Sequence, residues 1–157
     1  MYPQTHFLFP YFIALILTEF GLLSWKLALL AGLVGVLVDL DHYFEHMLHA
    51  KKNRFSLKDT WNYSIKLHKF YQRSFVHHWI GAMLVGLILL IILFFNWKIS
   101  IALAIGYYSH LILDHYHLKG KKLEIKVGSL FIDEFYTEII VDVILLILVF
   151  VMVGFIF

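Results

Sequence analysis

Long apolar stretches are the feature that most limits what this chain can fold into. They cover about residues 7–23, 25–42, 76–95, 99–116 and 138–157. Each comes near the length of about 17 to 25 residues that a helix needs to cross the hydrocarbon core of a bilayer. The chain is 61% hydrophobic, whereas apolar residues make up about half of an ordinary soluble domain. We therefore expect an all-α integral membrane protein, in which residues 1–157 form one domain of about five transmembrane helices in an up-down bundle.

Two of these stretches have polar ends. The second and the fourth reach membrane length only if their helices continue into residues 39–42 and 114–115, which would place those residues at the interface or in a protein-lined cavity. The segment between the second and third stretches is expected to contain an amphipathic helix, because apolar and aromatic residues recur there at helical spacing. The residues that set this spacing are Leu57, Trp61, Ile65 and His68. Alternating apolar and charged residues at 123–127 indicate a short extended piece instead.

Lysine and arginine are distributed unevenly between the connecting segments. Seven lie between the second and third apolar stretches, four lie between the fourth and the fifth, and only Lys26 and Lys98 lie elsewhere. By the positive-inside rule, the side that carries these eleven of the thirteen basic residues is cytoplasmic. The N-terminus is then cytoplasmic and the C-terminus lies outside the cell membrane. The formal net charge of +2 gives no reason to expect a nucleic-acid partner.

Ten histidines are unusual in a chain embedded in lipid, and several of them stand with aspartates at the ends of the apolar stretches. In an up-down bundle, the starts of odd-numbered helices and the ends of even-numbered helices share one membrane face, here the cytoplasmic one. Seven candidate metal ligands are expected at that face: His6, Asp39, Asp41, His42, His77, His110 and Asp114. His110 and Asp114 stand four residues apart, so a helix places both side chains on the same side.

The donors in this set are imidazole and carboxylate groups, because the chain has no cysteine. They suit a divalent metal, zinc first, with manganese or iron as alternatives. Seven donors exceed the need of one tetrahedral ion, so one or two ions are expected. The role of His78 stays open between a ligand, a support for a ligand and a lipid-interface residue. A carboxylate stripe at Glu134, Glu138 and Asp142 is equally open, since it could bond a site histidine or line an ion path.

Four short motifs together resemble a known family. They are Thr5-His6-Phe-Leu, Asp39-Leu-Asp41-His42, Arg73-Ser-Phe-Val-His77-His78 and Gly106-Tyr-Tyr-Ser-His110-Leu-Ile-Leu-Asp114. In order and in position they resemble the motifs of the YdjM-type membrane-bound metal-dependent hydrolases, over about residues 1–117. The resemblance implies that the seven residues above form the family's metal site, and that the chain is a hydrolase. The His-x-x-x-Asp element is also distantly similar to the helical zinc-dependent phospholipase C and nuclease fold. The chain departs from the family pattern at Val38, Ser74 and His78, where the family has Pro, Gly and Ser.

The leading hypothesis is metal-assisted hydrolysis of a phosphate ester in a lipid or other membrane-associated substrate, at the cytoplasmic face. Asp41, Asp114 and Arg73 are the candidate catalytic residues, and Arg73 stands one helical turn before His77, where it could pair with a phosphate. The alternatives are a metal sensor, a metal- or proton-coupled transporter, and a structural scaffold that docks anionic lipid. Residues 27–38 and 81–95 carry no polar side chain, which favours a one-sided site over a transport path. The substrate, the number of ions and the oligomeric state stay open.

Overall fold

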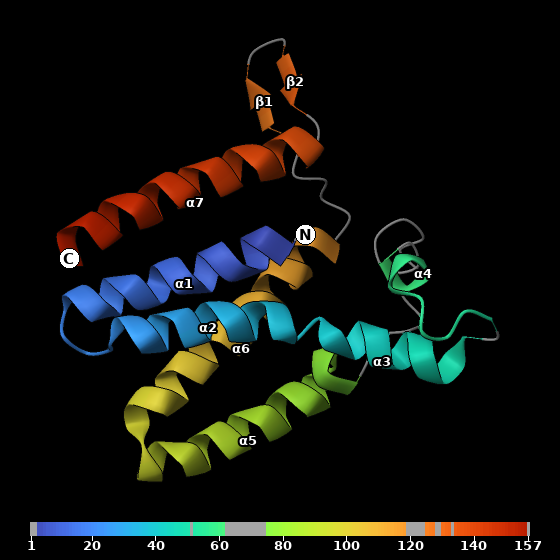
Figure 1. The fold of residues 1–157 in the computed structure, drawn as a ribbon, viewed down its shortest axis with the longest axis horizontal. Helices are drawn as coiled ribbons and strands as arrows, with labels where there is room; N and C mark the ends of the chain where they lie inside the picture. Colours follow the sequence, from blue (N-terminus) through green and yellow to red (C-terminus); the bar gives the residue numbers. More distant parts are fainter. Residues whose placement is uncertain are drawn as a thin grey trace. The chain divides into compact units, whose positions relative to one another are not determined.

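The computed structural model describes residues 3–50, 52–61, 75–118, 125–127, 130–132 and 134–156. In this part, the chain is almost wholly helical, with one pair of short strands (Figure 1). The helices are α1 (Pro3–Glu19), α2 (Trp25–Leu37), α3 (Leu40–His49), α4 (Leu57–Trp61), the 3-10 helix η3 (Phe75–His77), α5 (Trp79–Phe95), α6 (Trp97–Leu118) and α7 (Glu134–Ile156). The predicted helical fold class is therefore confirmed apart from the strand pair.

Local sequence signals explain where the helices begin and end. Pro3 is the first residue of α1, a position at which the missing N–H costs nothing. Gly21 has a φ of 70°, a left-handed conformation that glycine tolerates and that reverses the chain between α1 and α2. Asn96 caps α6, because its side-chain oxygen accepts the Ile99 N–H at 3.2 Å. The predicted continuation of the fourth apolar stretch through residues 114–115 is confirmed, since α6 extends to Leu118.

The second predicted span differs from the structure, because its helix is interrupted near the polar end. α2 ends at Leu37 and α3 begins at Leu40. At this junction the Asp41 N–H donates to the Val38 carbonyl and the His42 N–H donates to the Asp39 carbonyl. Each bond reaches the residue three positions earlier, as in a 3-10 helix, whereas the bonds of an α-helix reach four positions back. The tighter turn separates an apolar helix from an amphipathic one, which the sequence expectation joined into a single span over residues 25–42.

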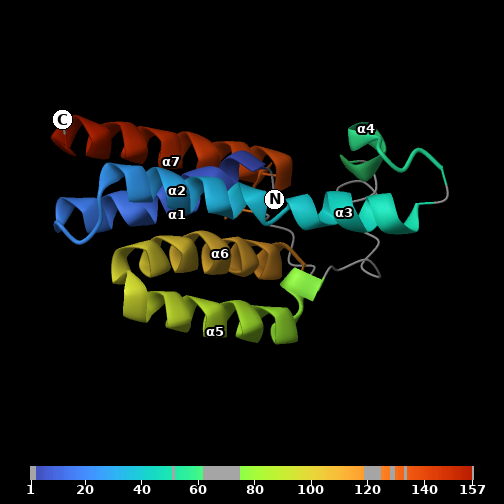
Figure 2. The ribbon, with the colours of Figure 1, turned by 60° about the horizontal axis from the view of Figure 1, so that its bottom comes forward.

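The backbone contacts group the chain into two compact units. The first contains Met1–Val36 and Leu89–Phe157, and the second contains Leu37–Ile88. In the first unit, α1 packs against α6 and α7, and Figures 1 and 2 both show α1 beside α7. The core of this unit comes from α1, α2 and α7 and from the turn between the first two: Ala14, Leu15, Leu23, Ala28, Ala31 and Val149.

The second unit contains α3, α4, η3 and the first half of α5. Within it, α3 packs against α4. The η3 turn folds back onto the beginning of α5, where a side chain at Gly81 would overlap the Phe75 carbonyl. Helix α4 covers the first part of the predicted amphipathic segment, and residues 62–74, which include Ile65, His68 and Arg73, lie outside the described residues.

The predicted extended piece is a β-strand. Strand β1 (Ile125–Val127) pairs antiparallel with β2 (Leu130–Ile132), and Lys126 stands opposite Phe131. The pair immediately precedes α7 in the sequence, so the connection between α6 and α7 contains a hairpin rather than helix alone.

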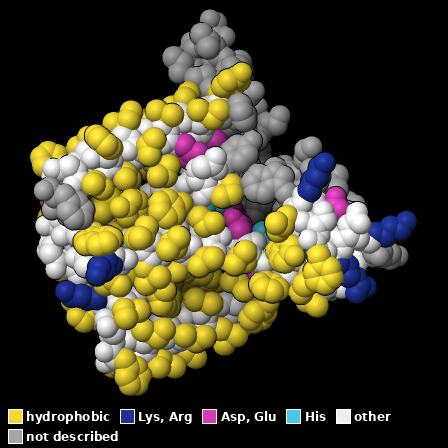
Figure 3. Space-filling model, viewed as in Figure 1, with side chains coloured by type: hydrophobic (Ala, Val, Ile, Leu, Met, Phe, Trp, Pro, Cys, Tyr) yellow, Lys and Arg dark blue, Asp and Glu magenta, His cyan; other side chains and the backbone are white. Residues whose placement is uncertain are grey.

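The helices expose much of their apolar surface. Hydrophobic side chains cover most of the face over α1, α2 and α7 in Figure 3, and large residues such as Phe150 and Phe94 are mostly exposed. Among the described residues, two stretches are long and apolar enough to cross a membrane by length and composition: Trp25–Leu48, which includes the tight turn between α2 and α3, and Tyr136–Phe155. Helix α5 is apolar but shorter. Exposed apolar helices of this kind are suited to a lipid environment.

Candidate functional site

Three of the predicted ligands meet in the first unit. Helix α1 carries His6, and α6 carries His110 and Asp114 one turn apart. The His6 Nε2 lies 3.3 Å from one carboxylate oxygen of Asp114, and the His110 Nε2 lies 3.5 Å from the other. The side chains of His6 and His110 are only 1% and 0% exposed, whereas Asp114 is 18% exposed. One ligand atom from each residue lies within 4.8 Å of the others, close enough for all three to hold one metal ion.

A backbone contact fixes the tautomer of His110. Its Nδ1–H donates to the Gly35 carbonyl at 2.7 Å, so in the neutral ring the Nε2 that faces Asp114 carries the lone pair. Metal-binding histidines commonly donate their second ring nitrogen to a carbonyl or carboxylate in this way, because the bond orients the ring and raises its basicity. His110 is therefore held ready to act as a ligand.

The arrangement of the His6 ring supports the fit of a cation. Its Nδ1 is buried and has no hydrogen-bond partner among the described residues, and its Nε2 faces Asp114. The two imidazole rings lie with centroids 4.2 Å apart. Two nitrogens and one carboxylate are a donor set that suits zinc, manganese or iron, and catalytic zinc sites often use three protein ligands. The residues present thus fit the divalent metal that the sequence predicts.

Glycines on α2 and α6 bring the helix backbones close enough for this contact. A side chain at Gly35 would overlap the His6 carbonyl and lie 2.8 Å from the Pro10 ring. A side chain at Gly106 would lie 2.6 Å from the Ala31 carbonyl, so α6 also depends on a glycine where it meets α2. Glycine and alanine permit such close approach between membrane helices. The α1–α2–α6 contact therefore sets the spacing of the histidines.

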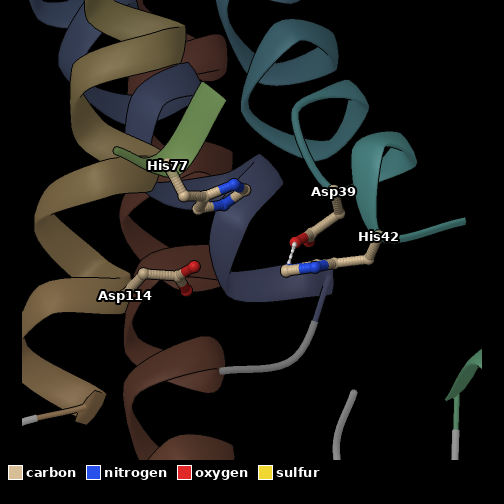
Figure 4. A group of neighbouring side chains, drawn as sticks. All are labelled: Asp39, His42, His77 and Asp114. Carbon is tan, nitrogen blue, oxygen red and sulfur yellow. Dashed lines mark ion pairs between the residues drawn. The ribbon is translucent and has the colours of Figure 1, made fainter. Parts of the chain in front are cut away.

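A second group of predicted ligands lies in the second unit. The tight junction between α2 and α3 places Asp39 and His42 on one side, with the His42 Nε2 3.8 Å from the Asp39 carboxylate. His77 comes from η3, and its ring stacks on that of His42 at a centroid distance of 4.9 Å. In Figure 4 these three side chains point toward one another; Asp114, also labelled, belongs to the first unit. Ligand atoms of Asp39, His42 and His77 lie within 4.8 Å of one another.

Asp41 supports this group through His77. Its Oδ2 accepts a hydrogen bond from the His77 Nδ1–H at 2.6 Å, and both side chains are largely buried. The bond leaves the Nε2 of His77 as the nitrogen with a lone pair, so Asp41 orients a ligand in the manner of the carboxylate–histidine pairs at metal sites.

The Asp41→Asn substitution is expected to weaken metal binding by this second group about 10- to 100-fold, because His77 loses the carboxylate that orients its ring. The affinity would be measured by zinc titration in a His110→Ala background, in which the first group is disabled. Asp59→Asn, which removes an acid of α4, is the matched control and should leave the affinity unchanged. Equal zinc affinities with and without Asp41→Asn in the His110→Ala background would show that the Asp41–His77 contact does not support a ligand.

Helix α7 reaches the beginning of α1 through a polar contact. The hydroxyl of Thr5, which is fully buried, donates to the Asp142 carboxylate at 2.7 Å. Thr137 and Glu138, on the preceding turn of α7, are also buried. Asp142, one member of the carboxylate stripe whose role the sequence left open, therefore contacts the residue next to His6, which fixes the position of α1 against α7.

Thr5→Val is expected to lower the free energy of unfolding by about 1 kcal/mol, because the Asp142 carboxylate loses a donor within a helix interface. Unfolding in mixed micelles, combined with Asp142→Asn in a double-mutant cycle, measures the coupling between the two side chains. Thr18→Val is the control, since the Thr18 hydroxyl donates to the Ala14 carbonyl of its own helix and to no other helix in the described part of the chain. Additive effects of the two substitutions would argue against the contact.

Comparison with known proteins places the chain in a family. A family model described as YdjM inner membrane protein matches residues 1–156. The chain belongs to the YdjM inner membrane protein family. The match includes α7, which lies beyond the four motifs that carried the resemblance. No match to this YdjM-family chain was found among curated proteins or among solved structures.

The remaining predicted residues of this YdjM-family protein lie apart from the two groups or outside the described part. His78 is exposed at the start of α5. Arg73 lies outside the described residues, as do the side chains of Glu134 and His117. The Gly35 carbonyl and the Thr5 hydroxyl were not predicted as site contacts, although Thr5 stands in the first motif and Gly35 is one of two glycines three residues apart in an apolar stretch.

Proposed function

We propose that this protein is a membrane-embedded, metal-dependent hydrolase that cleaves a phosphate ester in a lipid or another membrane-associated substrate. The observation that carries the proposal is the buried group of His6, His110 and Asp114, with His110 already oriented by the Gly35 carbonyl. A divalent metal, when bound, polarises a phosphoryl oxygen and makes water more acidic, which is the chemistry that ester hydrolysis at neutral pH requires.

The chain's own residues would have distinct parts in this reaction. His6, His110 and Asp114 would hold one ion, and Asp39, His42 and His77 would hold a second, with Asp41 orienting His77. Asp114 is the most exposed of the first group, so its carboxylate is the ligand that a substrate or a water molecule can approach. Arg73 is proposed to pair with the phosphate, because a guanidinium presents a fork of donors that matches phosphate oxygens.

The proposal includes a membrane orientation. Five spans with a cytoplasmic N-terminus would place the site at the cytoplasmic face, as the distribution of basic residues predicts. A lipid or polyprenyl phosphate could reach a site at that depth without leaving the bilayer. Since the chain has no cysteine, Lys52→Cys and Lys98→Cys variants report the orientation directly. Impermeant thiol reagents should label them from opposite sides of sealed vesicles, and labelling from the same side would reject this topology.

Metal content and hydrolysis, measured together, test the function. Protein purified without chelators should contain at least one transition-metal ion per chain and should release phosphate from a membrane-lipid extract. Chelation should abolish this activity and added zinc or manganese should restore it. Phosphomonoester, phosphodiester and carboxylester substrates assayed in parallel would define the reaction class. Bound metal without hydrolysis of any substrate would favour a metal sensor or transporter, and metal-free protein would reject both functions.

A further inference from the structure

The second unit exposes an apolar stripe along α3. Leu40, Phe44 and Leu48 recur every four residues, so they stand one above another on the same face of the helix, and all three are exposed. His46, on a different face, is buried. α3 is thus an amphipathic helix whose apolar face has no covering element among the described residues.

The loop after α3 has a defined shape although its apolar side chains are exposed. The Nε2 of His46 donates to the Asn53 carbonyl at 3.3 Å, and the Arg54 Nε donates to the Ala50 carbonyl at 2.9 Å. Phe55 and Leu57 nevertheless remain 74% and 72% exposed. The loop is therefore held against α3 while it presents two large apolar side chains outward.

Basic residues surround these apolar side chains. Lys52, Arg54 and Lys58 are all exposed, and they flank Phe55 and Leu57 along the chain. The combination of protruding apolar groups with adjacent positive charge suits the boundary between acyl chains and anionic headgroups. It does not resemble a protein interface, whose centre is typically depleted in lysine.

We propose that the stripe of α3 and residues 52–58, together called the basic apolar surface, dock onto the anionic headgroups of the surrounding bilayer. Phe55 and Leu57 insert below the headgroups, and the three basic side chains contact lipid phosphates. This surface belongs to the second unit alone and does not depend on the proposed hydrolase activity. Its role is to hold α3 in the plane of the interface.

Spin labels can test this docking, because a chain without cysteine accepts a single label at any chosen position. The Phe55→Cys and Leu57→Cys variants would be labelled with a nitroxide and reconstituted into vesicles of phosphatidylcholine with or without phosphatidylglycerol. In the anionic vesicles, both labels should collide readily with oxygen and rarely with a water-soluble nickel chelate. A label at Lys98→Cys, an exposed position outside the basic apolar surface, should remain accessible to the chelate.

A charge variant separates headgroup recognition from simple burial. Lys52→Gln combined with Lys58→Gln should lower the ratio of docked to undocked loop about 30-fold in anionic vesicles. Each basic residue near such a surface contributes a factor of about five, and the two factors multiply. Lys26→Gln with Lys98→Gln makes the same change in net charge at exposed positions elsewhere and should leave the labels immersed. Equal immersion in neutral vesicles would overturn the proposal. So would labels that stay in water, or spin–spin broadening that indicates contact with a second copy.

Discussion

Asp114→Ala is expected to abolish stoichiometric metal binding by the His6–His110–Asp114 group and, with it, any metal-dependent hydrolysis. The carboxylate of Asp114 faces both imidazole Nε2 atoms, so its removal takes away the only negative charge that this group offers to a cation. Loss of a supporting residue at a metal site typically lowers affinity 10- to 100-fold, and loss of a direct ligand should cost at least about 100-fold. Zinc titration and elemental analysis of purified protein measure the effect.

His115→Ala is the matched control for this prediction. His115 is the next residue along α6 but is exposed, so its removal should leave metal content and affinity unchanged. An Asp114→Ala protein that folds normally and binds as many metal ions as the wild type, with unchanged affinity, would show that the three side chains only satisfy one another as a buried His–carboxylate cluster. The metal-site interpretation of the first unit would then be rejected.

Gly35→Ala is expected to damage the same group without touching any ligand. A methyl group at this position would overlap the His6 carbonyl and press on the Pro10 ring, so α1 must move away from α2. Overpacking of this kind typically lowers the free energy of unfolding by about 1–3 kcal/mol. The movement would also separate His6 from His110, whose ring is bonded to the Gly35 carbonyl. We therefore expect lower stability and weaker zinc binding together, measured by thermal unfolding and by metal titration.

Gly154→Ala is the control for the glycine substitution. The same methyl group at Gly154, near the end of α7, would meet no atom within 4 Å. It should leave both stability and metal binding near the wild-type values, or raise stability slightly because alanine favours helix. If Gly35→Ala behaved in the same way, the close approach of α1 and α2 would not control the geometry of the histidines.

The sequence was most informative about the helices and least informative about how they meet. Apolar length predicted the bodies of α1, α5, α6 and α7, and alternation predicted strand β1, because both signals are local. The interruption between α2 and α3 was missed, since apolar residues stand on both sides of Asp39 and no proline or glycine marks the turn. Only the backbone bonds of Asp41 and His42 to residues three positions earlier define it.

The candidate site was also predictable from the sequence only in part. Spacing predicted that His110 and Asp114 share one side of a helix, and in the structure the His110 Nε2 lies 3.5 Å from an Asp114 carboxylate oxygen. The partner of the other His110 nitrogen is a backbone carbonyl of Gly35, which every residue possesses and no composition reveals. The role of Asp41 was likewise hidden, because a carboxylate that binds metal and one that orients a histidine look identical in a sequence.

The contact between Thr5 and Asp142 has a consequence for how the protein is made. Helix α1 carries His6 and Thr5, but their partners lie on α6 and α7, which are synthesised after it. A nascent chain therefore cannot bring His6, His110 and Asp114 together until α6 has been made, and α1 cannot contact Asp142 until α7 has followed. Chains truncated before α7 would lack the contact that anchors α1.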